Sequence, residues 1–264
     1  MSPKVRRRPL VSGNWKMNFD HFEAIHAARD LGLRLTASAV ATVDVSVHPP
    51  FTDLRSVQTV LEAENIPASL GAQNCAVEDA GAFTGEVSPL MLAKLHVNYV
   101  IVGHSERRTL FDESNEVVAA KLRAVLRNGM VPIVCVGESL DERNTGLANE
   151  RLAGQVEEAI TGLAPEAVAS MVIAYEPIWA IGAGQAATPD DAQEACAWIR
   201  EVVGRTAGPD PAESVRIQYG GSVAPDNTAE LVGGDDIDGV LVGKASLDAA
   251  TLVGIIDAVG GTVR

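Results

Sequence analysis

Glu176 stands where a short apolar run ends and a segment rich in proline and glycine begins. Residues 171–174 read Met-Val-Ile-Ala, which predicts a buried strand, and Pro177 keeps the backbone of Glu176 out of the helical region. Gly182 and Gly184 leave the following loop free to hinge and to bring its N–H groups close to a ligand. The pattern predicts a base that transfers protons in a site shielded from water by a closing loop.

Other polar and glycine-rich groups follow other short apolar runs of the chain. Asn14 and Lys16 would supply a cation, and Gly103-His104-Ser105-Glu106 would supply an electrophile. Two anion sites would come from Gly220-Gly221-Ser222 and Gly243-Lys244. Each group alone has an ordinary explanation, such as a surface lysine or a solvated turn carboxylate. Together they are what proton transfer on an anionic substrate requires.

The apolar runs alternate with longer amphipathic segments, which is the pattern of successive βα units. Eight strands are predicted, at residues 10–14, 44–48, 68–73, 99–102, 131–136, 171–175, 215–219 and 239–242. Eight units in 264 residues have the length expected of a closed (β/α)8 barrel. Because the C-terminal ends of barrel strands carry the catalytic groups, closure would bring all the candidates to one mouth.

An open, doubly wound sheet is the structural alternative, but it ordinarily has a Gly-rich phosphate loop after its first strand. Residues 13–18 read Gly-Asn-Trp-Lys-Met-Asn, which is not that fingerprint. Helix signals also fit βα units, since Gly129 is placed to end one helix and Thr188-Pro189 to begin another.

No linker long enough to separate two cores is present. The densest group of Pro and Gly, at 206–211, is interpreted as a short surface loop. The prediction is therefore one domain over 1–264, in which 1–8 form a poorly ordered extension.

Composition restricts the partners and the compartment. The net charge of −14 would repel nucleic acid and anionic membranes, so neither is an expected partner, and an anionic substrate needs a local positive site. No apolar stretch of signal-peptide or transmembrane length follows the basic start. Cys75, Cys135 and Cys196 lack metal-ligand spacing, which favours reduced thiols in a cytoplasmic protein.

The motifs, in chain order, resemble those of the triosephosphate isomerase family. The matching segments are 13–18, 102–108 (Val-Gly-His-Ser-Glu-Arg-Arg), 174–177 (Ala-Tyr-Glu-Pro), 179–182 (Trp-Ala-Ile-Gly) and 219–223 (Tyr-Gly-Gly-Ser-Val). The resemblance implies an α/β fold, the single-domain (β/α)8 TIM barrel. It further implies interconversion of dihydroxyacetone phosphate and D-glyceraldehyde 3-phosphate through an enediolate, with no cofactor and no metal.

The resemblance also implies a role for each group at the mouth. Glu176 is the base, and a neutral His104 polarises the carbonyl and shuttles a proton between the two oxygens. Lys16 and Asn14 stabilise negative charge on the substrate. The phosphate-binding positions are Gly182, Ser222, Gly243 and Lys244.

Supporting positions surround these groups. Glu106 is expected to hold Lys16, Ser105 to begin the helix beside His104, and Cys135 to pack behind Glu176. The lid and the residues that control it are Ile178, Trp179, Ala180, Ile181, Ala183 and Gly184, with Glu138 orienting Trp179 in the open lid and Tyr219 and Ser222 holding the closed lid.

Residues 74–87 form a long segment without helical or strand periodicity, which in a compact domain indicates function. By resemblance its tip inserts into the second subunit of a homodimer, with Thr84 near that subunit's Asn14 and Glu106. The dimer loop comprises Phe83, Thr84, Gly85 and Glu86, and Arg107 is the expected intersubunit partner of Glu86.

Two residues depart from the family pattern: Lys244 replaces a second glycine, and Ala183 replaces a threonine of the lid. A positive φ at Lys244 would be strained, so either the angle is ordinary or the loop has shifted. Our hypothesis is that the N–H of Lys244 still binds phosphate while its side chain points outward or adds a weak charge at the rim.

Two other functions remain open at this level. An isomerase of a four-carbon ketose phosphate would use the same residues and differ only in relative kcat/KM. A catalytically silent barrel that serves assembly or binding would be expected to lose the base, the electrophile or the lid. Asn14, Lys16, His104 and Glu176 are all present.

Overall fold

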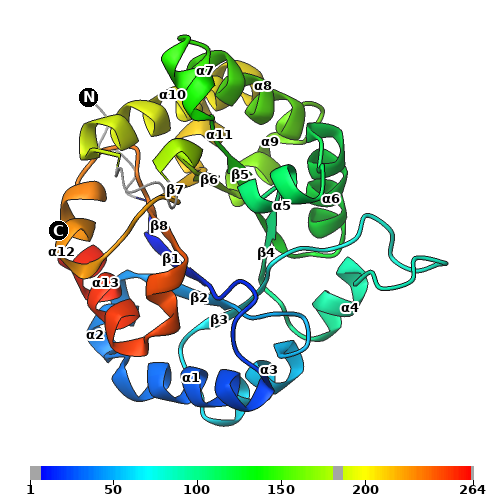
Figure 1. Ribbon diagram of the computed structural model, residues 1–264, viewed down its shortest axis with the longest axis vertical. Coiled ribbons are helices and arrows are strands. Elements are labelled where there is room, and N and C mark those ends of the chain that lie inside the picture. Colours follow the sequence, from blue (N-terminus) through cyan, green and yellow to red (C-terminus); the bar gives the residue numbers. More distant parts are fainter. Residues whose placement is uncertain (1–6, 181–186, 263–264) are drawn as a thin grey trace.

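The computed structural model describes residues 7–180 and 187–262, and it shows a closed barrel of parallel strands surrounded by helices (Figure 1). The strands are β1 (Leu10–Asn14), β2 (Asp44–His48), β3 (Ser69–Ala72), β4 (Tyr99–Val102), β5 (Val131–Val136), β6 (Val172–Tyr175), β7 (Arg216–Tyr219) and β8 (Gly239–Val242). Each strand pairs with the next in the chain, and β8 pairs with β1. The predicted barrel is confirmed, although the predicted ranges of β3, β6 and β7 are one residue too long at one or both ends.

Helices return the chain from the end of each strand to the start of the next. They are α1 (His21–Arg34), α2 (Ala37–Thr42), α3 (Leu54–Ala63), α4 (Pro89–Lys94), α5 (Ser105–Leu110), α6 (Asn115–Arg127), α7 (Leu140–Asn144), α8 (Ala148–Ile160), α9 (Pro165–Ser170), α10 (Pro189–Ala207), α11 (Pro209–Ser214), α12 (Pro225–Leu231) and α13 (Ala249–Thr262). Two short 3-10 helices, η1 (Ile178–Ala180) and η2 (Lys244–Leu247), follow β6 and β8. Among the described helices, none is both long and apolar enough to cross a membrane.

Local signals in the sequence explain several helix ends. Thr188 caps α10 and Pro189 is its first residue, as predicted, and Gly129 follows α6 with a φ of 74°. The predicted surface loop at 206–211 is wrong. Gly208, with a φ of 102°, is the single residue between α10 and α11, because Pro209 begins a new helix instead of ending the previous structure.

Strands β4, β6 and β8 are buried on both faces, which is why they appear in the sequence as continuous apolar runs. One apolar cluster lies between the strands and the helices, and a smaller one fills the barrel interior. The interior also holds polar side chains, some of which form hydrogen bonds with one another and with backbone carbonyls. Gln218 donates hydrogen bonds of 2.9 Å to the carbonyl of Leu10 and to the hydroxyl of Ser12.

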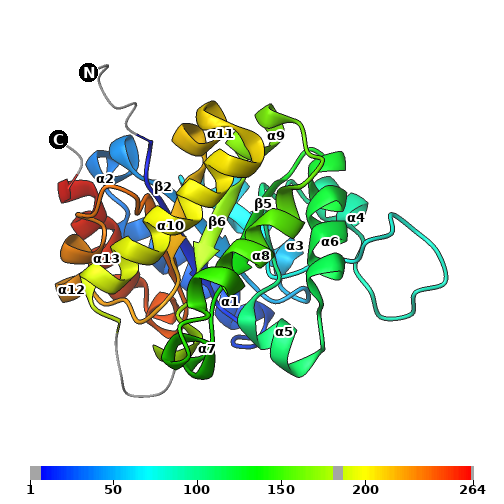
Figure 2. The ribbon, with the colours of Figure 1, turned by 90° about the horizontal axis from the view of Figure 1, so that it is seen from above.

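One segment leaves the body of the molecule. The loop between β3 and α4 extends away from the barrel in both views (Figures 1 and 2), and residues 81–86 at its tip are exposed. At the start of the described chain, Arg7 and Arg8 form ion pairs of 2.6 and 2.5 Å with Asp238 and Asp44. These pairs tie the beginning of the chain to the strand ends opposite the mouth.

Candidate active site

Glu176 directly follows β6, and the neighbouring strands hold its backbone from both sides. Its N–H donates to the carbonyl of Val136 at 2.8 Å, and the N–H of Gly220 donates to the carbonyl of Tyr175 at 2.7 Å. A Cβ on Gly137 would lie 2.0 Å from the Glu176 carbonyl oxygen. Only glycine therefore permits β5 to approach Glu176 this closely.

The carboxylate of Glu176 is 2% exposed and contacts the segment that follows β4. One oxygen lies 3.0 Å from Nε2 of His104, and the other accepts the N–H of Ser105 at 2.8 Å. The carboxylate and the imidazole therefore meet inside the mouth, although they are far apart in the sequence.

The hydrogen bonds of His104 determine which ring nitrogen carries the proton. His104 caps the N-terminus of α5, where its Nδ1 accepts the N–H of Glu106 at 3.2 Å. A nitrogen that accepts from a backbone N–H has a free lone pair, so the ring is neutral and its proton is on Nε2. Nε2 thus donates to Glu176, and a substrate oxygen placed between them would receive the same N–H.

Lys16 is held in an unusual backbone conformation, with a φ of 52°. Its N–H donates to the side-chain oxygen of Asn14 at 3.0 Å, and Gln73 donates to its carbonyl at 2.8 Å and to that of His48 at 2.9 Å. The ammonium forms an ion pair with Glu106 at 2.5 Å. These contacts fix a cation beside the imidazole.

Gln73 and Arg108 were not among the predicted site residues. Gln73 bridges the ends of β1 and β2, while Arg108 donates to the carbonyl of Gly103 at 2.8 Å and to that of Cys135 at 3.2 Å, which links the ends of β4 and β5. The position of Gln73 at the end of a predicted strand was a usable signal. The sequence contained no comparable signal for Arg108, whose contacts depend on the fold of α5.

The turn after β8 lies against the turn after β1. A Cβ on Gly243 would lie 4.0 Å from Nζ of Lys16, and the hydroxyl of Ser246 donates to the Gly243 carbonyl at 2.7 Å. Lys244 begins η2, is exposed and does not have a positive φ, so its backbone angle is ordinary. Ser222 is exposed after β7.

A cluster of buried and half-buried side chains supports the start of the predicted lid. Trp179 donates to Glu138 at 2.7 Å, Tyr175 donates to the same oxygen at 3.0 Å, and the guanidinium of Arg143 lies 4.4 Å from the centre of the Trp179 ring. Burial raises the pKa of Glu138, and the hydrogen bond from Trp179 opposes that rise. Ile178 and Ala180 belong to η1 in this region.

Four predicted lid and phosphate positions, Ile181, Gly182, Ala183 and Gly184, lie outside the described residues. Tyr219, which was predicted to hold the closed lid, is fully buried, and its hydroxyl has no hydrogen-bond partner among the residues that the structure describes. A Cβ on Gly221 would lie 2.1 Å from that hydroxyl, so the turn after β7 passes directly over the ring.

Cys135 lies next to Glu176 in the barrel interior. Burial raises the pKa of its thiol well above the ordinary value, and the nearby charge of Glu176 raises it further. The thiol is therefore protonated at neutral pH and is not a nucleophile.

The residues predicted to join two subunits lie on one side of the mouth. Phe83, Thr84, Gly85 and Glu86 are exposed at the tip of the protruding loop. Arg107 has an acidic neighbour within its own chain, since it pairs with Glu113 at 2.5 Å.

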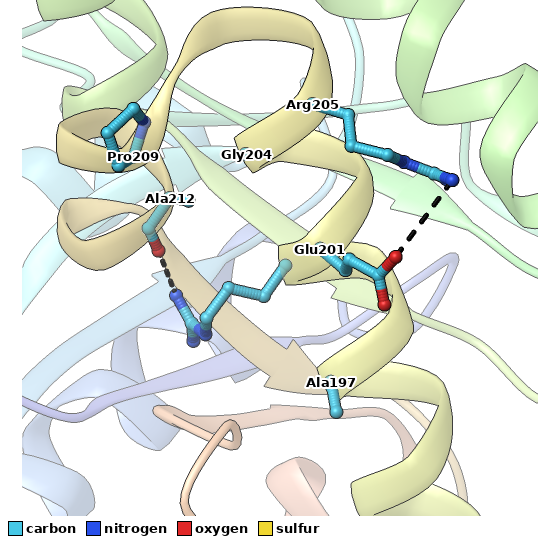
Figure 3. Close-up of a pocket in the computed structure, with 7 residues that line it drawn as sticks. Ala197, Glu201, Gly204, Arg205, Pro209 and Ala212 are labelled. Atoms are coloured by element: carbon cyan, nitrogen blue, oxygen red, sulfur yellow. Dashed lines mark hydrogen bonds and ion pairs between the residues drawn. The ribbon is translucent and has the colours of Figure 1, made fainter.

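A pocket lies between α10 and α11 (Figure 3), at the end of the barrel opposite the mouth. Ala197, Arg200, Glu201, Gly204, Arg205, Pro209 and Ala212 line it. Arg200 donates to the carbonyl of Ala212 at 2.6 Å and also pairs with Asp236 and Asp238. The guanidinium of Arg200 thus links α10 to α11 and to the segment before β8. The groups suited to proton transfer lie at the mouth instead.

Comparison with known proteins gives a consistent result. The model of the family described as triosephosphate isomerase matches residues 9–259. Triosephosphate isomerase of Rhodococcus jostii is 50% identical over 260 residues, which cover 97% of this chain and 99% of that protein. The enzymes of the same name from Cutibacterium acnes (49% identical; 96% and 98% covered) and Corynebacterium glutamicum (50%; 92% and 94%) are similar to nearly the same extent.

Proposed function

The chain belongs to the triosephosphate isomerase family, and we propose that Glu176, His104 and Lys16 carry out the isomerisation for which that family is named. The reaction interconverts dihydroxyacetone phosphate and D-glyceraldehyde 3-phosphate and is a step of glycolysis and gluconeogenesis. It moves one proton between adjacent carbons and another between the two oxygens.

Glu176 removes the proton from the carbon next to the carbonyl and returns it to the neighbouring carbon. The carboxylate is buried yet lies at the mouth, so a substrate reaches it while bulk water does not. Before it can act, the substrate must replace the contacts of the carboxylate with His104 and Ser105. Those two donors are then free to bind substrate oxygens.

His104 donates its Nε2 proton to the carbonyl oxygen as negative charge develops there. The N–H of Glu106 holds the opposite nitrogen as an acceptor, which supports a neutral imidazole in this role. Lys16 and Asn14 lie on the same side of the mouth and stabilise the enediolate electrostatically. Glu106 holds the ammonium in place.

The phosphate group binds to the turns after β7 and β8, through Ser222, Gly243 and Lys244, and to Gly182 of the lid. Barrels commonly build phosphate sites from these two turns. The lid then closes over the substrate from its base at Trp179, which Glu138 orients, and excludes water from the enediolate.

The observation that carries this proposal is the 3.0 Å contact between Nε2 of His104 and the buried carboxylate of Glu176 at the mouth. Its test is a coupled assay with glyceraldehyde 3-phosphate. Glu176→Gln keeps the shape of the side chain but removes the base, so kcat should fall by about 10²- to 10⁴-fold. The matched control is Glu166→Gln, which changes an exposed carboxylate at the other end of the barrel and should retain wild-type turnover. Equal turnover in the two variants would contradict the mechanism.

The proposed molecule is a homodimer of single-domain subunits in the cytoplasm. The protruding loop supports this, because Phe83 at its tip is 45% exposed and Met17, which follows β1 at the mouth, is 95% exposed. Insertion of the loop into a second subunit would cover both side chains.

A further inference from the structure

Lys244 has a cationic side chain that forms no ion pair with any residue that the structure describes. Among the lysines and arginines that the structure describes, Lys94 and Lys244 are the two whose side chains form neither an ion pair nor a hydrogen bond with another described residue. Lys244 follows β8 at the mouth, in the turn that leads to α13 (Figure 1). Lys94 is the last residue of α4, at the opposite end of the barrel.

The other cation at this part of the mouth is already paired. Nζ of Lys16 lies 2.5 Å from a carboxylate oxygen of Glu106, which cancels much of its field at a distance. The chain as a whole carries a net charge of −14, so a substrate with a phosphate dianion is repelled until it is close to the site. A second, unpaired cation would compensate for this repulsion.

The turn that carries Lys244 is held firmly beside Lys16. Ser246 donates its N–H to the Gly243 carbonyl at 2.8 Å, and a Cβ on Gly13 would lie 3.0 Å from Cβ of Ser246. Since adjacent Cα atoms are about 3.8 Å apart, the Cα of Lys244 lies within about 9 Å of the Lys16 ammonium. This distance is close to the screening length of about 8 Å at physiological ionic strength, so a charge on Lys244 still acts on an anion bound near Lys16.

We propose that Lys244 is a substrate-binding cation, whose ammonium attracts the phosphate dianion to the turn after β8. This inference rests on the proposed function, because it assigns the phosphate to that turn. The ordinary backbone angle at Lys244 removes the expectation that a lysine here strains the site. The residue instead adds charge without a conformational cost.

The test measures binding of inorganic phosphate by calorimetry and KM for glyceraldehyde 3-phosphate in Lys244→Gln, Lys244→Gly and Lys94→Gln. At about 20 mM salt, the Lys244 variants should show a phosphate Kd and a KM raised about fivefold, and at about 200 mM salt the difference should shrink below about twofold. The loss should fall on KM rather than on kcat. Lys94→Gln changes the net charge equally and should match the wild type in both measurements.

Two results would overturn the inference. One is an unchanged phosphate Kd in Lys244→Gln at low salt, and the other is tighter phosphate binding in Lys244→Gly, which would mean that lysine impairs the site. Phosphate binding does not require turnover. A wild type that binds phosphate through Lys244 but does not isomerise glyceraldehyde 3-phosphate would therefore refute the proposed reaction and leave the cation assignment standing.

Discussion

At the scale of single residues, the candidate site uses one backbone turn for two purposes. The turn at the start of α5 orients His104 through the N–H of Glu106, and the N–H of Ser105 donates to the carboxylate of Glu176. In the proposed mechanism, a substrate displaces the carboxylate from these donors and then accepts their hydrogen bonds. Restraint of the proposed base and polarisation of the substrate would thus be alternatives within one set of hydrogen bonds.

His48 provides a prediction for the pH dependence of stability. It is fully buried at the end of β2, and burial lowers its pKa from 6.5 to about 4, although a hydrogen bond to the Ala72 carbonyl opposes the shift. Between these values the unfolded chain takes up a proton that the folded chain does not. The free energy of unfolding should therefore fall by up to about 3 kcal/mol as pH drops from about 6.5 to 4.

Urea denaturation at several pH values measures this effect. His48→Gln should flatten the dependence within that window, whatever its effect on stability at pH 7. His26→Gln, at an exposed position on α1, should keep the wild-type slope. If the slopes of the wild type and His48→Gln coincide, the burial of a neutral imidazole does not govern the acid sensitivity.

At the scale of elements, the eight strands could be predicted because each is a short segment that alternates with a longer helical pattern and is followed by a turn. The same rule identified Asn14, His104 and Glu176 as strand-end residues. It could not identify the contacts of Arg108, which joins two carbonyls that are neighbours only in the folded barrel. The sequence also could not show whether the residues around Gly208 form a loop or begin a helix, because proline and glycine occur in both.

The close approach of β5 to Glu176 gives a prediction about catalysis. Gly137→Ala would place a Cβ 2.0 Å from the Glu176 carbonyl oxygen, and both partners are backbone atoms of strand ends that cannot move separately. The displaced base should lower kcat by at least about tenfold, since a shift of about 1 Å can cost about 100-fold. The substitution should also lower the free energy of unfolding by about 1–3 kcal/mol.

A matched substitution separates catalysis from general damage. Gly154→Ala lies within α8, where an added Cβ meets no neighbouring atom, and it should be neutral or stabilising by up to about 1 kcal/mol with normal kcat. A Gly137→Ala variant with wild-type turnover would show that the backbone spacing at β5 does not position Glu176.

At the scale of the whole molecule, a substitution in the protruding loop can test the proposed homodimer. Phe83→Asp places a charge at the exposed tip, where burial against a second subunit would leave it unpaired. Light scattering at micromolar concentration should give the mass of a dimer for the wild type and of a monomer for the variant, with turnover reduced in the monomer.

Leu33→Asp serves as the control for a charge placed at an exposed apolar side chain. Leu33 is 87% exposed near the end of α1, away from the mouth, and its replacement should leave the dimer intact. A wild-type mass equal to one subunit would contradict the assembly itself, and a dimeric Phe83→Asp would show that the loop is not its main contact.

The pairing of β1 with β8 brings together parts of the site that lie near opposite ends of the sequence. Asn14 and Ser246 are 232 positions apart, yet the hydroxyl of Ser246 lies 3.4 Å from the carbonyl of Asn14. The cation of the site, Lys16, therefore follows the first of the eight strands, and the turn that faces it follows the last. A nascent chain that stops before β8 has the base, the imidazole and the lysine but lacks the wall that positions them together. We therefore expect a chain truncated before β8 to show no isomerase turnover.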